Sequence, residues 1–90
     1  MPYAALKVKI MPTSPEADLK KIEESAKFRI ENLDAKMHAV EIEPIAFGLN
    51  AIIITIAWPE SQDLDLIENA LSQIDEVNSV EVIDFRRAIG

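Results

Sequence analysis

Apolar and polar residues alternate along the first stretch of the chain, from Tyr3 to Met11. Leucine, valine and isoleucine at positions 6, 8 and 10 are separated by lysines at positions 7 and 9. A period of two residues is typical of a β-strand with one face on a core and the other in water. The pattern therefore predicts a first strand over 3–11.

The next segment has the period of a helix. Apolar residues recur at spacings of three and four, and they are Leu19, Ile22, Ala26, Ile30 and Leu33. Such spacing places one apolar stripe along a helix. Ser14 and Pro15 predict where this helix begins, as a capping residue and a first-turn residue. Residues 32–34 predict its end.

Alternation returns after this helix. Residues 37–42 predict a second strand with His38, Val40 and Ile42 on one face. The segment 43–49 contains both a proline and a glycine, so the chain is expected to leave the strand there. The β-branched run over 50–58 then predicts a third strand.

The last part of the chain predicts one more helix and one more strand. After a polar loop over 59–63, a second amphipathic helix is predicted by Leu64, Ile67, Leu71 and Ile74. Residues 77–87 predict a final strand. Its two faces are predicted to carry Val80 and Val82 on one side, and Ile83 and Phe85 on the other.

The predicted order is βαββαβ, which indicates an α+β fold of the ferredoxin-like type. That fold has a four-stranded antiparallel sheet with two helices on one face. Ninety residues, 49% of them hydrophobic, fit one domain over 1–90. We take 3–11 and 77–87 to be the two central strands of this sheet.

Charge and composition narrow the class of protein. The net charge of −7 opposes a nucleic acid as the direct partner, because phosphates are bound by cationic surfaces. The chain has no cysteine, no apolar run long enough to span a bilayer and no export signal after Met1. We therefore expect a cytoplasmic protein away from membranes. We also expect a monomer.

The residues offer little apparatus for covalent chemistry. His38 is the single histidine, so a transition-metal site lacks ligands, and we interpret it as a half-buried strand residue. The acidic residues do not have the spacing of a calcium loop, and the serines lie in no nucleophile motif. With two glycines no phosphate-binding loop can form. We expect no metal, no cofactor and no catalytic side chain.

Two features of the sequence have both a structural and a functional interpretation. Phe47 followed by Gly48 fits an aromatic ring that projects from a strand junction, and it also fits a core phenylalanine beside a turn. Arg86 and Arg87 fit cations that extend beyond the sheet, and also a pair of solvated charges on an acidic surface. The local pattern alone favours the structural interpretation of both features.

Four segments in this order resemble the archaeal elongation factor 1-beta family. They are 8–12 (VKIMP), 18–24 (DLKKIEE), 43–49 (EPIAFGL) and 77–87 (VNSVEVIDFRR). The resemblance extends over essentially the whole chain. It implies a ferredoxin-like guanine-nucleotide exchange factor that promotes GDP release and GTP loading of the GTPase elongation factor 1-alpha.

The resemblance also implies roles for particular residues. The family's loop motif matches Pro44, Phe47 and Gly48, and Phe47 is then expected to press into the GTPase near its nucleotide site. Eukaryotic relatives have a lysine near the carboxyl end that enters the magnesium and phosphate region, and the aligned residue here is Arg87. This departure leaves three possibilities: Arg87 takes the role, Arg86 takes it, or the GTPase switch region is displaced without either.

Three other functions are compatible with the same fold. The first is a ligand-sensing or oligomeric regulatory module, in which Phe47 and Gly48 form a simple turn. The second is an acylphosphatase-like enzyme, which Pro12 and Pro15 oppose because they remove backbone donors from the loop that would bind an anion. The third is an RNA-binding module, for which the predicted central strands offer one aromatic residue, Phe85, in an acidic domain.

Overall fold

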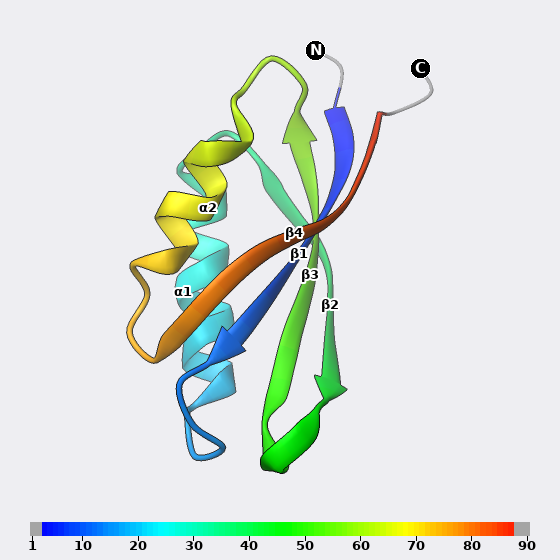
Figure 1. The fold of residues 1–90 in the computed structure, drawn as a ribbon. Coiled ribbons are helices and arrows are strands. Elements are labelled where there is room, and N and C mark those ends of the chain that lie inside the picture. Colours follow the sequence, from blue (N-terminus) through cyan, green and yellow to red (C-terminus); the bar gives the residue numbers. More distant parts are fainter. Residues whose placement is uncertain (1–2, 88–90) are drawn as a thin grey trace.

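The chain folds in the order βαββαβ in a computed structural model that describes residues 3–87 (Figure 1). The elements are β1 (Tyr3–Pro12), α1 (Leu19–Glu31), β2 (Lys36–Pro44), the short 3-10 helix η1 (Ala46–Gly48), β3 (Asn50–Pro59), α2 (Leu64–Ser72) and β4 (Val77–Arg87). Each predicted helix and strand is present, with boundaries shifted by a few residues.

The four strands form one sheet in the order β2-β3-β1-β4, and all neighbours are antiparallel. Both helices lie on the same side of this sheet (Figure 1). The fold is ferredoxin-like, as predicted. The central strands are β1 and β3, however, so the prediction that β4 is central was wrong. The connection through α2 carries the chain past β1 and leaves β4 at an edge.

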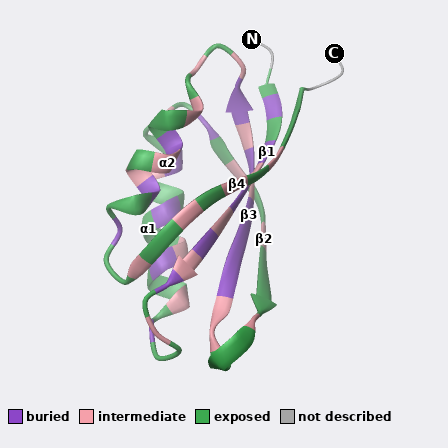
Figure 2. Ribbon diagram, viewed as in Figure 1, coloured by how far each residue is buried: buried purple, intermediate pink, exposed green. Residues whose placement is uncertain are grey.

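The core lies between the helices and one face of the sheet (Figure 2). Every second residue of the two central strands contributes, because successive side chains of a strand point to opposite faces. The buried side chains on this face are Leu6, Val8 and Ile10 of β1 and Ile52, Ile54, Ile56 and Trp58 of β3. The apolar stripes of the helices cover them with Ile22, Ala26 and Ile30 of α1 and Ile67 and Leu71 of α2.

A bulge in β2 changes which side chains share a face. The register shifts between Met37 and Ala39, and His38 is the additional residue. As a result Met37 and Val40 both pack against the core, three positions apart. His38 is exposed rather than half-buried, and the prediction that it shares a face with Val40 was wrong.

A second bulge lies in β4, at Ile83. Val82 pairs with one residue of β1 and Asp84 with the next, so Ile83 has no partner in the ladder. Beyond the bulge Phe85 pairs with Leu6, whose side chain is buried in the core. Phe85 therefore lies on the face of Val82, and its predicted place on the opposite face was wrong.

Helix α1 begins later than predicted. Asp18 is the N-cap, and its Oδ1 accepts a hydrogen bond of 3.2 Å from the backbone N–H of Lys21. Ser14 belongs to a turn before the helix, where its carbonyl accepts from the N–H of Ala17 at 3.2 Å. The start predicted from Ser14 and Pro15 was therefore wrong by about one helical turn.

Candidate functional site

The connection between β2 and β3 is a short closed loop with Phe47 at its tip. Ile45 N–H donates to the carbonyl of Leu49 at 2.8 Å, and Leu49 N–H donates to Ala46 at 3.3 Å. Between these bonds Phe47 has φ 63° and ψ 27°, which is a left-handed conformation. Its side chain is 92% exposed, so the interpretation of Phe47 as a core residue is excluded.

The conformation of Phe47 is costly for a residue with a side chain. A left-handed backbone brings Cβ close to the following carbonyl oxygen, which costs about 1–2 kcal/mol outside glycine. No burial compensates for this cost, because the ring lies in solvent. Strained and exposed aromatic residues of this kind concentrate at binding sites. Phe47 is therefore the strongest candidate for a partner contact among residues 3–87.

Pro44 and Gly48 shape the two sides of this loop. Pro44 is the last residue of β2 and pairs with Asn50, and it lacks an N–H with which to extend the ladder. Gly48 has φ 77°, which favours glycine. A Cβ at Gly48 would meet Pro15 at 3.9 Å, an ordinary contact, so backbone conformation and not space requires the glycine.

The two arginines lie at the end of β4, and each is close to a carboxylate. Arg86 Nε is 3.2 Å from Asp84 Oδ2, and Arg87 Nε is 3.7 Å from Glu60 Oε1. The arginine side chains are 80% and 82% exposed, so the guanidinium groups remain accessible to a partner. Sequence reasoning did not identify Glu60, because it is 27 positions from Arg87 and has no motif around it.

The structure does not bring Phe47 and Arg87 together. Strand β3 has ten residues, and it begins beside the Phe47 loop and ends at the level of Arg87. At about 3.3 Å per residue the two groups are roughly 30 Å apart. Figure 1 shows η1 at the lower end of the sheet and the end of β4 at the upper end. If both act on one partner, they contact separate regions of it.

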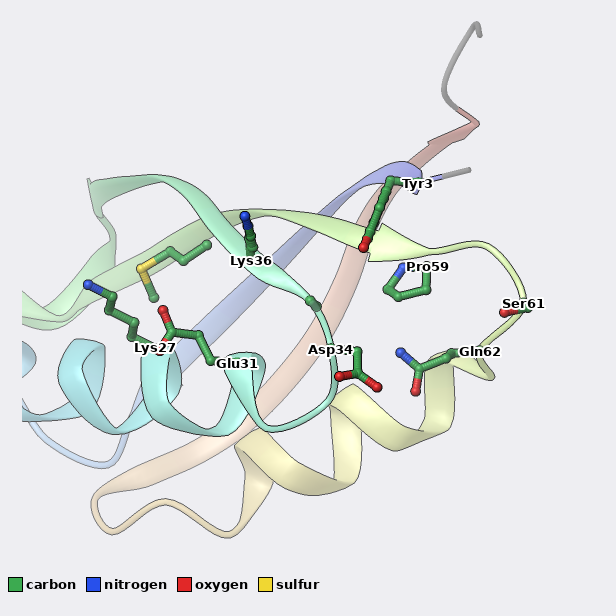
Figure 3. A pocket seen from close by; sticks show the side chains of 10 residues that line it. Tyr3, Lys27, Glu31, Asp34, Lys36, Pro59, Ser61 and Gln62 are labelled. Atoms are coloured by element: carbon green, nitrogen blue, oxygen red, sulfur yellow. The ribbon is translucent and has the colours of Figure 1, made fainter. Parts of the chain in front are cut away.

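A hollow of about 980 Å³ lies at the end of the sheet where β4 finishes at Arg87 (Figure 3). Side chains from β1, α1, β2 and the loop after β3 line it, and Asp34 and Gln62 face each other across it. Lysine and acidic side chains both contribute, with Lys27 and Lys36 near Glu31 and Asp34. This mixture of charges is not selective for an anion or a cation.

The structure of residues 3–87 bears on three other features considered from the sequence: a metal site, an RNA-binding surface and a membrane-spanning helix. In this described part, no group of three or more histidine, cysteine or acidic side chains could hold a metal ion. Among the described residues, the uncovered faces of the true central strands carry Lys7, Lys9, Thr55 and one aromatic residue, Tyr3, rather than the stacked aromatic pair that RNA-binding modules use. Within the same residues no helix is both long and apolar enough to cross a membrane.

Known proteins are similar to this chain over nearly its whole length. A family model described as the EF-1 guanine nucleotide exchange domain matches residues 5–88. A protein named elongation factor 1-beta from Methanocaldococcus jannaschii is 46% identical over 79 residues, which cover 87% of this chain and 89% of the relative.

Two further relatives carry the same name. The one from Methanococcus maripaludis strain C5 is 40% identical over 79 residues, with the same coverage of 87% and 89%. The one from Methanosphaera stadtmanae is 42% identical over 82 residues, which cover 89% of this chain and 90% of the relative. Each match covers at least 87% of this chain, so it includes the Phe47 loop in the middle of the chain.

Proposed function

The chain belongs to the EF-1 guanine nucleotide exchange domain family, and we propose that it acts on the GTPase elongation factor 1-alpha from both ends of its sheet. It is a guanine-nucleotide exchange factor of the elongation factor 1-beta type. The observation that carries the proposed mechanism is the exposed, left-handed Phe47 at one end, with the Arg86–Arg87 pair at the other.

Exchange of this kind requires differential binding and no reactive group. A factor that binds the nucleotide-free GTPase more tightly than the loaded form weakens nucleotide binding by the same ratio. We propose that this exchange factor works without covalent chemistry and without a cofactor. Its contacts need only be better satisfied when the GTPase has released its nucleotide.

Phe47 is proposed to provide the apolar part of this difference. Burying a phenylalanine side chain stabilises a complex by about 1.5–3 kcal/mol. The loop hydrogen bonds at Ile45 and Leu49 already hold the ring outward, so little ordering is needed on binding. A pocket that opens fully only in the nucleotide-free GTPase would couple this burial to nucleotide release.

The terminal cations are proposed to provide the electrostatic part. A guanidinium placed near the magnesium position of the GTPase repels the metal and competes for the phosphate oxygens. Arg87 is the leading candidate because the resemblance aligns it with the lysine of eukaryotic relatives, and Glu60 Oε1 lies 3.7 Å from its Nε at the end of the sheet. Arg86 is the neighbour that could replace it. A planar guanidinium contacts phosphate in a different geometry from a lysine ammonium.

We further propose that the protein is a cytoplasmic monomer with no direct contact to nucleic acid or membrane. Both edge strands of the described sheet contain a bulge, at His38 in β2 and at Ile83 in β4. Bulges and charged side chains on edge strands oppose pairing between sheets of different molecules. The net charge of −7 opposes binding to phosphate backbones.

The test is the release of a fluorescent GDP analogue from archaeal elongation factor 1-alpha with excess GTP. The wild-type protein should accelerate release in a saturable way, and Phe47→Ala should lower the acceleration about tenfold or more. Phe28→Ala is the matched control, because Phe28 is another exposed phenylalanine, 67% exposed, on α1. A folded wild-type sample without any acceleration would contradict the proposed function.

A further inference from the structure

Gln62 links the turn after β3 to two other parts of the molecule. Its backbone N–H donates to the carbonyl of Pro59 at 3.0 Å and closes the turn 59–62. Its backbone carbonyl accepts from Trp58 Nε1 at 3.2 Å. Its side-chain Nε2 donates to the backbone carbonyl of Leu33, just after α1, at 2.6 Å. The turn is therefore tied both to the core and to the helix layer.

The same turn carries Glu60, and Glu60 lies beside Arg87. Glu60 Oε1 is 3.7 Å from Arg87 Nε, and the Glu60 side chain is 21% exposed. In the sequence Glu60 stands between the two residues whose hydrogen bond closes the turn, Pro59 and Gln62. Its place therefore depends on the shape of the turn.

The register of the sheet explains why a turn after β3 reaches the end of β4. Ala4 of β1 pairs with Trp58 on one side and with Arg87 on the other. Residues directly opposite one another share a face of the sheet, so Arg87 lies on the face of Trp58, which is fully buried in the core. Two strand spacings separate these residues, roughly 10 Å. The turn and the end of β4 are thus neighbours on the helix side of the sheet.

Arg87 has few other contacts that could orient it. Its side chain is 82% exposed, and β4 is an edge strand. Within the part of the chain that the structure describes, Glu60 is the one carboxylate that pairs with it. An exposed ion pair gains little when two flexible side chains must both lose rotamer freedom. A carboxylate whose turn is already ordered lowers that cost.

We infer that Gln62 is a positioning residue for nucleotide exchange. Its hydrogen bonds to Trp58 and Leu33 set the turn that presents Glu60, and Glu60 in turn orients Arg87 toward the partner. The inference rests on the proposed function, in which Arg87 meets the GTPase near its magnesium ion. Gln62 itself needs no contact with the GTPase, because it acts through the turn.

The test measures catalysed release of a fluorescent GDP analogue from elongation factor 1-alpha. Gln62→Ala removes the bond to Leu33, and Trp58→Phe removes the indole donor while keeping an aromatic ring in the core. Arg29→Ala is the matched control. Arg29 Nη1 donates to the carbonyl of Ala70 at 3.2 Å, which is also a partly buried bond from a side chain to the backbone of a distant segment.

Gln62→Ala should lower the maximal rate of catalysed release about two- to fivefold, the range expected when one exposed ion pair loses its geometry. Trp58→Phe should act in the same direction. The half-saturating concentration of Gln62→Ala should stay within about twofold of wild type, because the contact of Phe47 is unchanged. Arg29→Ala should leave both values within about twofold of wild type.

A double variant shows which group Gln62 acts through. In an Arg87→Ala background, Gln62→Ala should change the rate no further, because the group that it positions is absent. An undiminished loss in that background would overturn the inference, since Gln62 would then act through something else. Equal losses in Gln62→Ala and Arg29→Ala would overturn it too, because reduced stability alone would then explain both.

The Nε–H signal of Arg87 in the free protein gives a readout that does not depend on exchange. Its nitrogen relaxation reports motion on the picosecond-to-nanosecond timescale. Gln62→Ala should make this group more mobile, and Arg29→Ala should not. If the wild type does not accelerate GDP release while this signal responds as expected, the proposed function fails and the positioning of Arg87 stands. If release is accelerated and Gln62→Ala behaves like wild type in both measurements, the positioning fails and the function stands.

Discussion

Arg87 at the end of β4 is paired with Glu60 in the turn after β3, with 3.7 Å between Nε and Oε1. The Glu60 side chain is 21% exposed, whereas that of Arg87 is 82% exposed. The Glu60 side chain is therefore mostly covered by its surroundings, whereas the Arg87 side chain extends into solvent. Glu60 is placed to orient the arginine without itself reaching far from the surface.

Glu60→Gln should therefore lower exchange more than stability. Removing the carboxylate frees Arg87 to adopt other rotamers, and the gain from one exposed ion pair corresponds to about a two- to fivefold change in rate. Nucleotide release should be measured across a magnesium titration, because a misplaced cation should alter the magnesium dependence. Glu60→Asp should restore part of the effect. A variant with wild-type release at every magnesium concentration would contradict this positioning role.

Gln62 connects two parts of the molecule, and its loss should reduce stability. Its side-chain Nε2 donates to the backbone carbonyl of Leu33 at 2.6 Å. Its backbone carbonyl accepts from Trp58 Nε1 at 3.2 Å. Gln62→Ala leaves the Leu33 carbonyl without this donor. The free energy of unfolding should fall by about 0.5–1.5 kcal/mol.

Urea unfolding followed by the fluorescence of Trp58, the single tryptophan, measures this change. Ser61→Ala is the control, because Ser61 is exposed and adjacent in the chain. Equal urea midpoints for the two variants would show that the Gln62 side chain contributes nothing to stability.

The strands and helices of this fold could be predicted because their signals are local. Alternation over 3–11 and spacings of three and four in 19–33 depend on neighbours in the sequence. The start of α1 was missed because Ser14 and Asp18 are both good capping residues. Ala17, between them, is buried in the folded chain, and the local pattern does not show this packing.

Bulges and the strand order could not be predicted, because they depend on pairing between distant segments. One additional residue at His38 or Ile83 moves every later side chain to the other face. The candidate site could be predicted only in part, for the same reason. The Phe47-Gly48 pair drew attention to this loop, but the exposure of Phe47, the approach of Pro15 to Gly48 and the carboxylate beside Arg87 required the folded chain.

Two acidic residues in left-handed conformations offer a way to stabilise the protein. Asp34 has φ 60° after α1, and Glu76 has φ 69° after α2. Glycine adopts this conformation without steric cost and is the common residue just after a helix. Asp34→Gly and Glu76→Gly should each raise the free energy of unfolding by about 0.5–1 kcal/mol.

The control for these two variants is a glycine inside a helix. Glu24→Gly in the middle of α1 should lower the free energy of unfolding by about 1 kcal/mol. A helical position has no left-handed strain to relieve, and glycine has a low helix propensity. Thermal and urea unfolding of the three variants gives the comparison. A loss of stability in Asp34→Gly or Glu76→Gly would mean that the carboxylate side chain contributes more than the backbone strain costs.

The separation of Phe47 and Arg87 predicts how their effects on exchange combine. The two side chains are roughly 30 Å apart along the ten residues of β3 and share no partner within residues 3–87. Changes at distant sites without shared contacts add in free energy to within about 0.3–0.5 kcal/mol. The fold-losses in catalysed GDP release of Phe47→Ala and Arg87→Ala should therefore multiply in the double variant. A double variant no slower than the worse single variant would contradict independent contacts, and would mean that one end engages the GTPase only after the other has docked.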